Sequence, residues 1–257
     1  MGMIANGKNL HFLVNFIEKL LLFLLIDSII VVIKSGERFS LGRNRKDEAK
    51  MDQKYQALFT PWKIGNVEIK NRIVLCPMGG TSLFGWMEFT GCAFDKEAAK
   101  FFLERAKNNV GLIIPGIAPL RDTILGTWLW KNEKMFKELK LFMDEIHKTG
   151  AKLFIQLTAG MGRSWAITDH IAPLHKNKLL RTLIKPIMDT DYQLASPSPL
   201  PARWDPEITT PEMTVEQIRE IIEAFAKTAK LCKEAGVDGV EVHAVHEGYL
   251  LDQFTLK

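Results

Sequence analysis

Val237-Asp-Gly-Val-Glu-Val-His243, continued by Ala-Val-His246-Glu-Gly-Tyr249, is the stretch that decides the fold of this chain. Its first seven residues form a β-branched run with the composition of a buried strand. The residues before it carry the signals of a helix, since Thr214 and Gln217 fit a capping box and Gly236 fits a helix stop. The face of that helix predicted to be buried consists of Ile218, Ile221, Ile222, Phe225, Ala229 and Cys232. A helix therefore leads into a strand that ends in polar residues.

The same alternation of strands and helices is found upstream. Three further apolar runs, residues 72–77, 110–115 and 152–157, are typical of buried strands. Helices are predicted over residues 95–107, with Asp95 as N-cap, and over residues 134–148, with Gly150 as the stop. The second helix is expected to bury Met135, Leu139, Phe142, Met143 and Ile146. A Pro-rich loop runs to Pro211, with a short helix expected near residues 178–188.

Four strands joined through helices predict a parallel sheet with right-handed crossovers, which fits both a doubly wound sheet and a (β/α)8 TIM barrel. No G-x-G-x-x-G follows any strand, so the usual dinucleotide-binding signal is absent. Polar or small residues instead mark the carboxyl end of each strand: Pro77-Met78-Gly79, Gly116, Gln156 and His243. Barrel enzymes place their sites on that face, so we expect an α/β fold of the TIM-barrel class. Because a barrel needs eight strands, the sequence predicts one truncated after about four βα units.

The N-terminal extension, residues 1–50, differs in composition from the predicted half-barrel at residues 51–257. Residues 10–33 are strongly apolar and predicted to be helical, but Glu18, Lys19 and Asp27 interrupt them. The uninterrupted runs are shorter than the roughly 20 residues that a spanning helix needs. Three interpretations stay open: a membrane anchor that leaves the rest on the cytoplasmic face, a helix packed on a partner, and a non-native upstream segment outside the working domain.

Charge and cysteine content argue against other classes of protein. The net charge of +4 is small and comes largely from the first 50 residues, so no nucleic-acid partner is expected. The three cysteines, Cys76, Cys92 and Cys232, show no C-x-x-C spacing. We therefore expect no disulfide framework and no complete zinc or iron–sulfur site, and a cytoplasmic protein with reduced thiols.

Several stretches between about Leu58 and Lys257 carry a resemblance to a known family. They are Leu58-Phe-Thr-Pro-Trp-Lys-Ile-Gly65, Asn71-Arg-Ile-Val74, Ala195-Ser-Pro-Ser-Pro199 and the run from Gly236 to Phe254. In these stretches the chain resembles the N-terminal half of the Old Yellow Enzyme family of FMN-dependent NAD(P)H oxidoreductases. It is most similar to the branch of 2-enoate, 2,4-dienoyl-CoA and bile-acid-type enoate reductases.

The resemblance implies reduction of an activated C=C bond in an enoate, enone or enoyl-CoA, with hydride derived from NADH or NADPH. Tyr249 matches the proton donor, and His243 and His246 match the pair that holds the carbonyl oxygen. Two N–H donors would stabilise the negative charge that develops there, as an oxyanion hole does. A phenol with a pKa near 10 stays protonated at neutral pH and can deliver a proton. No Cys, Asp or His run accompanies the histidines, so we expect no metal.

Further residues match the flavin-binding positions of the family. Pro77, Met78 and Gly79 match the segment under the flavin, and Gly116 matches a small residue that admits the ring. Gln156 matches the amide on the pyrimidine edge, where a donor and an acceptor side by side are useful. Without the resemblance, Gly79 and Gly116 also fit ordinary turns.

Two positions near the site leave their roles open. Arg163 lies in the loop after the third strand, where it could meet substrate or flavin or be a solvated loop residue. Glu247 is inserted relative to the commoner family pattern, so Tyr249 follows His243 by six residues and not five. The His-Glu-Gly-Tyr form resembles the anaerobic enoate-reductase branch and leaves open how His243 and His246 divide their role.

The resemblance also implies parts that this chain lacks. The family binds the FMN phosphate at loops after strands seven and eight, and longer members carry a 4Fe-4S cluster and an FAD-type dinucleotide domain. We therefore expect the chain alone to bind FMN weakly or not at all, and to self-associate or pair with a complementing half-barrel. The competing hypothesis is an inactive fragment with only self-association or membrane attachment through residues 10–33.

Overall fold

The computed structural model describes residues 53–78, 81–85, 92–165, 171–246 and 248–255. The predicted N-terminal extension, residues 1–50, lies outside them, as do Gly79 and Glu247. Within the described ranges, no helix is both long enough and apolar enough to cross a membrane.

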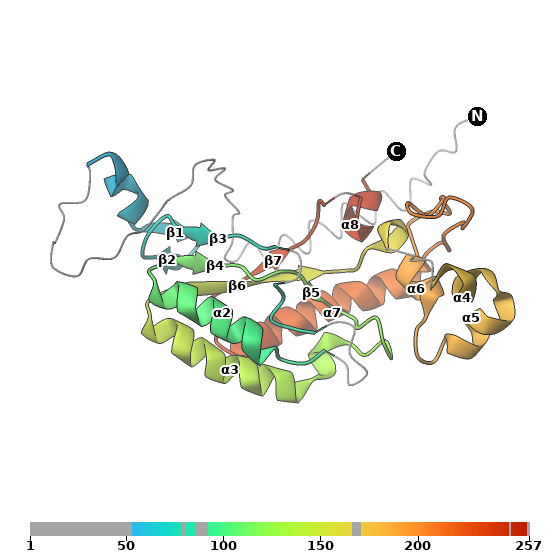
Figure 1. The fold of residues 1–257 in the computed structure, drawn as a ribbon, viewed down its shortest axis with the longest axis horizontal. Coiled ribbons are helices and arrows are strands. Elements are labelled where there is room, and N and C mark those ends of the chain that lie inside the picture. Colours follow the sequence, from blue (N-terminus) through green and yellow to red (C-terminus); the bar gives the residue numbers. More distant parts are fainter. Residues whose placement is uncertain (1–52, 79–80, 86–91, 166–170, 247, 256–257) are drawn as a thin grey trace.

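The main sheet is parallel (Figure 1), and in it β3 (Val74–Leu75) pairs with β4 (Leu112–Ile113), which pairs with the start of β6 (Lys152–Thr158). The short β5 (Ala118–Pro119) pairs with the end of β6, and β7 (Gly239–Val242) pairs with its middle. β3, β4, β6 and β7 thus pair in chain order, while β5 pairs with β6 and not with β4. A doubly wound sheet instead turns outward in both directions from its first strand. The sequential order is that of a barrel wall.

The long helices lie together on one side of this sheet (Figure 1). α2 (Lys96–Lys107) packs on β4 and on α3 (Glu133–Lys148), and α3 packs on β6 and on α7 (Val215–Glu234), which in turn packs on β7. A doubly wound fold needs helices on both faces of its sheet. The predicted TIM-barrel class is therefore confirmed.

Two apolar cores follow from the alternation of side chains along β6. Leu153, Ile155 and Leu157 pack with the helices in the larger core. Phe154 points to the opposite face, where it packs with Leu112 and Ile114. On this inner face these residues pack with a hairpin that the sequence analysis missed, β1 (Trp62–Ile64) and β2 (Val67–Ile69). Each strand of the hairpin has only three residues, which is too short for a periodic signal.

The helix signals in the sequence are confirmed in detail. Asp95 caps α2 by accepting the N–H groups of Glu97 and Ala98, and Thr214 and Gln217 form the predicted capping box of α7. Gly150 and Gly236 follow α3 and α7 with φ of +73° and +85°, which suits glycine. All five residues predicted to be buried on α3 are buried. On α7, Ile218, Ile222 and Ala229 are only partly buried, while Ala224 and Thr228, which were not predicted, are buried.

Short helices fill the connections. The single helix expected near residues 178–188 is wrong in extent, because α5 (Lys178–Ile184) is flanked by α4 (Ala172–Lys176) and α6 (Thr190–Leu194). The described ranges also contain the 3-10 helices η1 (Gln53–Phe59), η2 (Leu129–Lys131) and η3 (Gly162–Ser164). α8 (Leu250–Gln253) follows β7. Three of the four predicted strands are longer than those observed, and residues 110–115 contain only the two residues of β4, whereas β6 extends one residue beyond the predicted 152–157.

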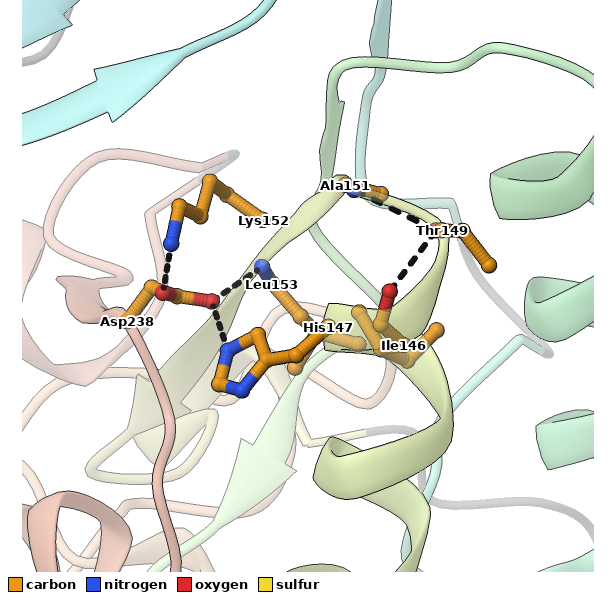
Figure 2. A network of polar contacts seen from close by, with 7 residues as sticks. All are labelled: Ile146, His147, Thr149, Ala151, Lys152, Leu153 and Asp238. Atoms are coloured by element: carbon orange, nitrogen blue, oxygen red, sulfur yellow. Dashed lines mark hydrogen bonds and ion pairs between the residues drawn. The ribbon is translucent and has the colours of Figure 1, made fainter.

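A polar network joins the amino ends of β6 and β7 to the end of α3 (Figure 2). The carboxylate of Asp238 lies 3.0 Å from His147 Nε2 and 2.9 Å from Lys152 Nζ. It also accepts the backbone N–H of Leu153 at 3.0 Å. This end of a barrel sheet lies opposite the face where barrel enzymes place their sites.

Candidate active site

Residues on the inner face of β6 and β7 form a series of cross-strand pairs. The register places Phe154 opposite Gly239 and Gln156 opposite Glu241, and the next pair along the same face is Thr158 and His243. A Cβ added at Gly239 would lie 2.6 Å from the Phe154 ring, so glycine is needed to admit that ring. The pairs change from apolar to polar towards the carboxyl ends of the strands, where a barrel enzyme has its site.

Gln156 and Glu241 form the first polar pair. Gln156 is 7% exposed, and its Nε2 donates a hydrogen bond to Glu241 Oε1. Burial raises the pKa of Glu241, and the hydrogen bond from Gln156 opposes that rise. The predicted site residue Gln156 therefore lies within the strand on its inner face, with its amide already held by a neighbouring carboxyl group.

Three aromatic rings gather just beyond β7. The ring centroids of His243 and His246 are 5.0 Å apart, and those of His243 and Tyr249 are 5.3 Å apart. The His246 and Tyr249 rings are 4.9 Å apart and nearly perpendicular. Burial, together with the nearby charge of His246, lowers the pKa of His243 to about 4. His243 is therefore neutral at pH 7 and presents one N–H donor and one acceptor nitrogen.

The turn that carries Tyr249 is held to the loop after β6 by several hydrogen bonds. The carbonyl of Gly248 accepts from Ser164 Oγ at 2.8 Å and from Gln253 Nε2 at 2.6 Å. Gln253 Nε2 also donates to the carbonyl of Met161, which belongs to the other loop. Gly248 has a φ of +76°, a conformation that favours glycine. These contacts fix the backbone on both sides of Tyr249.

The other predicted site residues lie at the same end of the sheet but outside the ring cluster. Pro77 and Met78 follow β3, and Met78 is 47% exposed. A Cβ at Gly116 would lie 2.4 Å from the carbonyl oxygen of Met78, so packing within the protein already requires glycine there. Arg163 lies in η3 and is joined to α8 through its backbone N–H, which donates to Gln253 Oε1 at 3.3 Å.

Sequence analysis missed Thr158, Glu241 and Gln253. The first two share a face with Gln156 and His243, and the period of two along residues 154–158 and 239–243 could have identified them. Gln253 needs the tertiary fold, because its partners are about 90 residues away in the chain. Among the described residues, no group of three or more His, Cys, Asp or Glu side chains could hold a metal ion.

A family match and several solved structures identify the family of this chain. Residues 57–257 match the NADH:flavin oxidoreductase / NADH oxidase family. This chain belongs to that family. Old Yellow Enzyme itself is among the solved structures that resemble it: the enzyme from Pichia sp. AKU4542 is 26% identical, with a TM-score of 0.54 over 76% of this chain and 47% of the other. A 2-naphthoyl-CoA reductase gives the same TM-score at 22% identity, a likeness of fold alone.

Curated relatives in the flavin oxidoreductase family extend well beyond the matched region. A cinnamate reductase of Clostridium sporogenes is 38% identical over 215 residues, which make up 80% of this chain and 28% of the relative. An NADPH dehydrogenase of Bacillus velezensis is 33% identical over 204 residues, 77% of this chain and 50% of the relative. The chain thus spans half or less of the length of these relatives.

Proposed function

We propose that this flavin oxidoreductase chain carries the carbonyl-binding and proton-donating groups of a site that reduces an activated C=C bond. The substrate class is an enoate, enone or enoyl-CoA, and the reducing equivalents come from NADH or NADPH. The observation that carries the proposal is the cluster of His243, His246 and Tyr249, whose rings lie within 4.9 to 5.3 Å of one another at the end of β7. The likeness to a cinnamate reductase supports an α,β-unsaturated carboxylate as substrate.

Each ring in the cluster has a distinct role in the proposed reaction. When bound, FMN supplies hydride to the β-carbon of the alkene. Negative charge then develops on the carbonyl oxygen, where His243 and His246 donate hydrogen bonds. Tyr249 delivers a proton to the α-carbon, which completes the reduction. The hydrogen bonds at Gly248 support this role, because they hold the turn from which Tyr249 projects.

The described residues fit part of an FMN site. One N–H of the Gln156 amide is used by Glu241, which leaves its second N–H and its Oε1 for the pyrimidine edge of a flavin. The backbone of Pro77 and Met78 is proposed to run under the flavin ring. At position 116, packing against Met78 is enough to explain why the residue is glycine. The strength of FMN binding by this chain stays a prediction.

The test is turnover of cinnamate and of a simple enone by the purified chain, with NADH and an excess of FMN. Tyr249→Phe removes the proposed donor and should lower the rate of alkene reduction by about 10²–10⁴-fold. Reduction of FMN by NADH should be unaffected, because it does not need that proton. Tyr55→Phe, in η1, is the matched control and should behave as the wild type.

Equal alkene reduction by the Tyr249→Phe variant would contradict the proposed proton donor. If neither form reduces the alkene at any FMN concentration, the competing hypothesis of a non-catalytic chain is favoured. Self-association through the outer edge of β7, and membrane contact through residues 10–33, are then the properties to measure. A cytoplasmic location is proposed because none of the three cysteines forms a disulfide.

A further inference from the structure

The hydroxyl group of Thr158 is buried beside His243. Thr158 is the last residue of β6 and is 2% exposed. Its Oγ1 accepts the backbone N–H of Gly160 at 3.2 Å and lies 3.4 Å from Nδ1 of His243. No other hydrogen-bond partner of this hydroxyl is found within the described ranges. The contact follows from the register of β6 and β7, which places the two side chains next to each other on the inner face.

The direction of the hydrogen bond between the two side chains follows from their donors and acceptors. A threonine hydroxyl has one hydrogen to donate and two lone pairs. Gly160 uses one lone pair, and a hydroxyl buried to this degree needs an acceptor for its own hydrogen. Nδ1 of His243 is the acceptor within reach. A hydrogen bond to one ring nitrogen of a neutral histidine determines which nitrogen carries the proton.

We propose that Thr158 selects the tautomer of His243 in which Nδ1 is an acceptor and Nε2 carries the hydrogen. Thr158 is thus a positioning residue that acts through His243. The catalytic meaning of this assignment rests on the proposed function, in which a His243 N–H must point at the carbonyl oxygen of the substrate. The other tautomer would turn a lone pair towards that oxygen and remove one of the two donors. The low pKa of His243 agrees with this assignment, because only a neutral ring has tautomers.

The tautomer can be measured by NMR without flavin or substrate. The full chain is produced with nitrogen-15-labelled histidine, and the two ring nitrogens of each histidine are correlated with the carbon-bound ring protons at neutral pH. The chain has six histidines, and the signals of His243 are those lost in a His243→Gln variant. The expected wild-type result is an Nδ1 shift typical of an unprotonated nitrogen and an Nε2 shift typical of N–H.

Two substitutions separate the hydroxyl from the shape of the side chain. Thr158→Val keeps the branched shape and removes the hydroxyl, so the tautomer ratio should move towards Nδ1–H by roughly threefold to tenfold. Thr158→Ser keeps the hydroxyl and should keep the wild-type ratio. Thr228→Val is the matched control, since Thr228 is also fully buried but lies on α7. It should leave the His243 signals unchanged.

A wild-type spectrum with Nδ1–H as the main tautomer of His243 would overturn the proposal, even if neither Thr158 variant folds. An unchanged ratio in Thr158→Val would overturn it as well. Because the measurement does not use turnover, failure of the proposed function and failure of the tautomer assignment give different results. If the chain does not reduce the alkene but Nε2–H is the main tautomer of His243, the proposed function is refuted and the tautomer assignment is supported.

Discussion

At the scale of single residues, His243 combines burial with a titratable ring, and this makes the stability of the fold depend on pH. Its pKa is lowered to about 4 in the folded chain, mainly by burial. The unfolded chain takes up that proton near the ordinary value of about 6.5. Between these two values the unfolded state binds more protons than the folded state, so stability falls as the pH falls from 6.5 towards 4. Burial also lowers the pKa of His175, which contributes with the same sign.

We predict that the loss of unfolding free energy between pH 7 and pH 5 is smaller in His243→Gln than in the wild type. The variant removes the titrating ring, and the contribution of His175 and of the carboxylates is common to both proteins. Urea unfolding at the two pH values gives the two differences. Equal losses in the two proteins would show that His243 does not carry this pH dependence.

Some residues of the candidate site could be predicted from the sequence, and others could not. His243, His246 and Tyr249 were identified through family resemblance, and the structure brings their rings together. Thr158 and Glu241 were missed: the period of two along each strand puts them on the faces of Gln156 and His243, but which residue faces which depends on the register between β6 and β7. The reason for glycine at position 116 could not be read from the sequence either, since it is the close approach of the Met78 carbonyl oxygen from the segment that follows β3.

At the scale of elements, local signals were enough for the long helices and insufficient for the short segments. α2, α3 and α7 have N-caps at Asp95, Asn132 and Thr214, and their apolar faces repeat over several turns. The strands β1 and β2 and the helices α4 to α6 have between three and seven residues each, so no period can be read from them. Their positions are set by packing against parts of the chain that are distant in sequence.

We predict that Thr214→Ala lowers the free energy of unfolding by about 1 kcal/mol. The Thr214 side chain accepts the N–H of Gln217, and the Gln217 side chain accepts the N–H of Thr214, so the substitution leaves one helix donor without its partner. Thr182→Ala is the control, because its exposed hydroxyl donates to a carbonyl within α5 and caps no helix end. Thermal unfolding should separate the two variants, and equal melting temperatures would contradict the role of the capping box.

At the scale of the whole molecule, the two ends of the sheet have different chemistry. The carboxyl ends of β6 and β7 carry the amide, hydroxyl and imidazole groups of the candidate site. The amino ends carry the network of Asp238, which joins α3, β6 and β7 (Figure 2). In barrel proteins the first end is catalytic and the second serves stability. A substitution at Asp238 should therefore change stability and leave the site intact.

We predict that Asp238→Ala lowers the free energy of unfolding by about 2 kcal/mol, since hydrogen bonds to a charged group contribute about 1.5–3 kcal/mol. The side chain of Asp238 is 8% exposed, and the N–H of the fully buried Leu153 loses its acceptor when the carboxylate is removed. Asp238→Asn retains an acceptor oxygen for Leu153 and loses the charge that faces Lys152. Its effect should lie between those of alanine and the wild type. Urea unfolding at pH 7 measures all three.

Glu223→Ala provides the control for the removal of a carboxylate. Glu223 pairs with Lys227 on the surface of α7, and both side chains are well exposed, at 66% and 41%. An exposed pair of this spacing contributes about 0.3–0.5 kcal/mol, so this variant should be close to the wild type. The tautomer of His243 should be the same in both carboxylate variants, because neither touches the site. If Asp238→Ala were no more destabilising than Glu223→Ala, the network at the amino ends of the strands would not hold the three elements together.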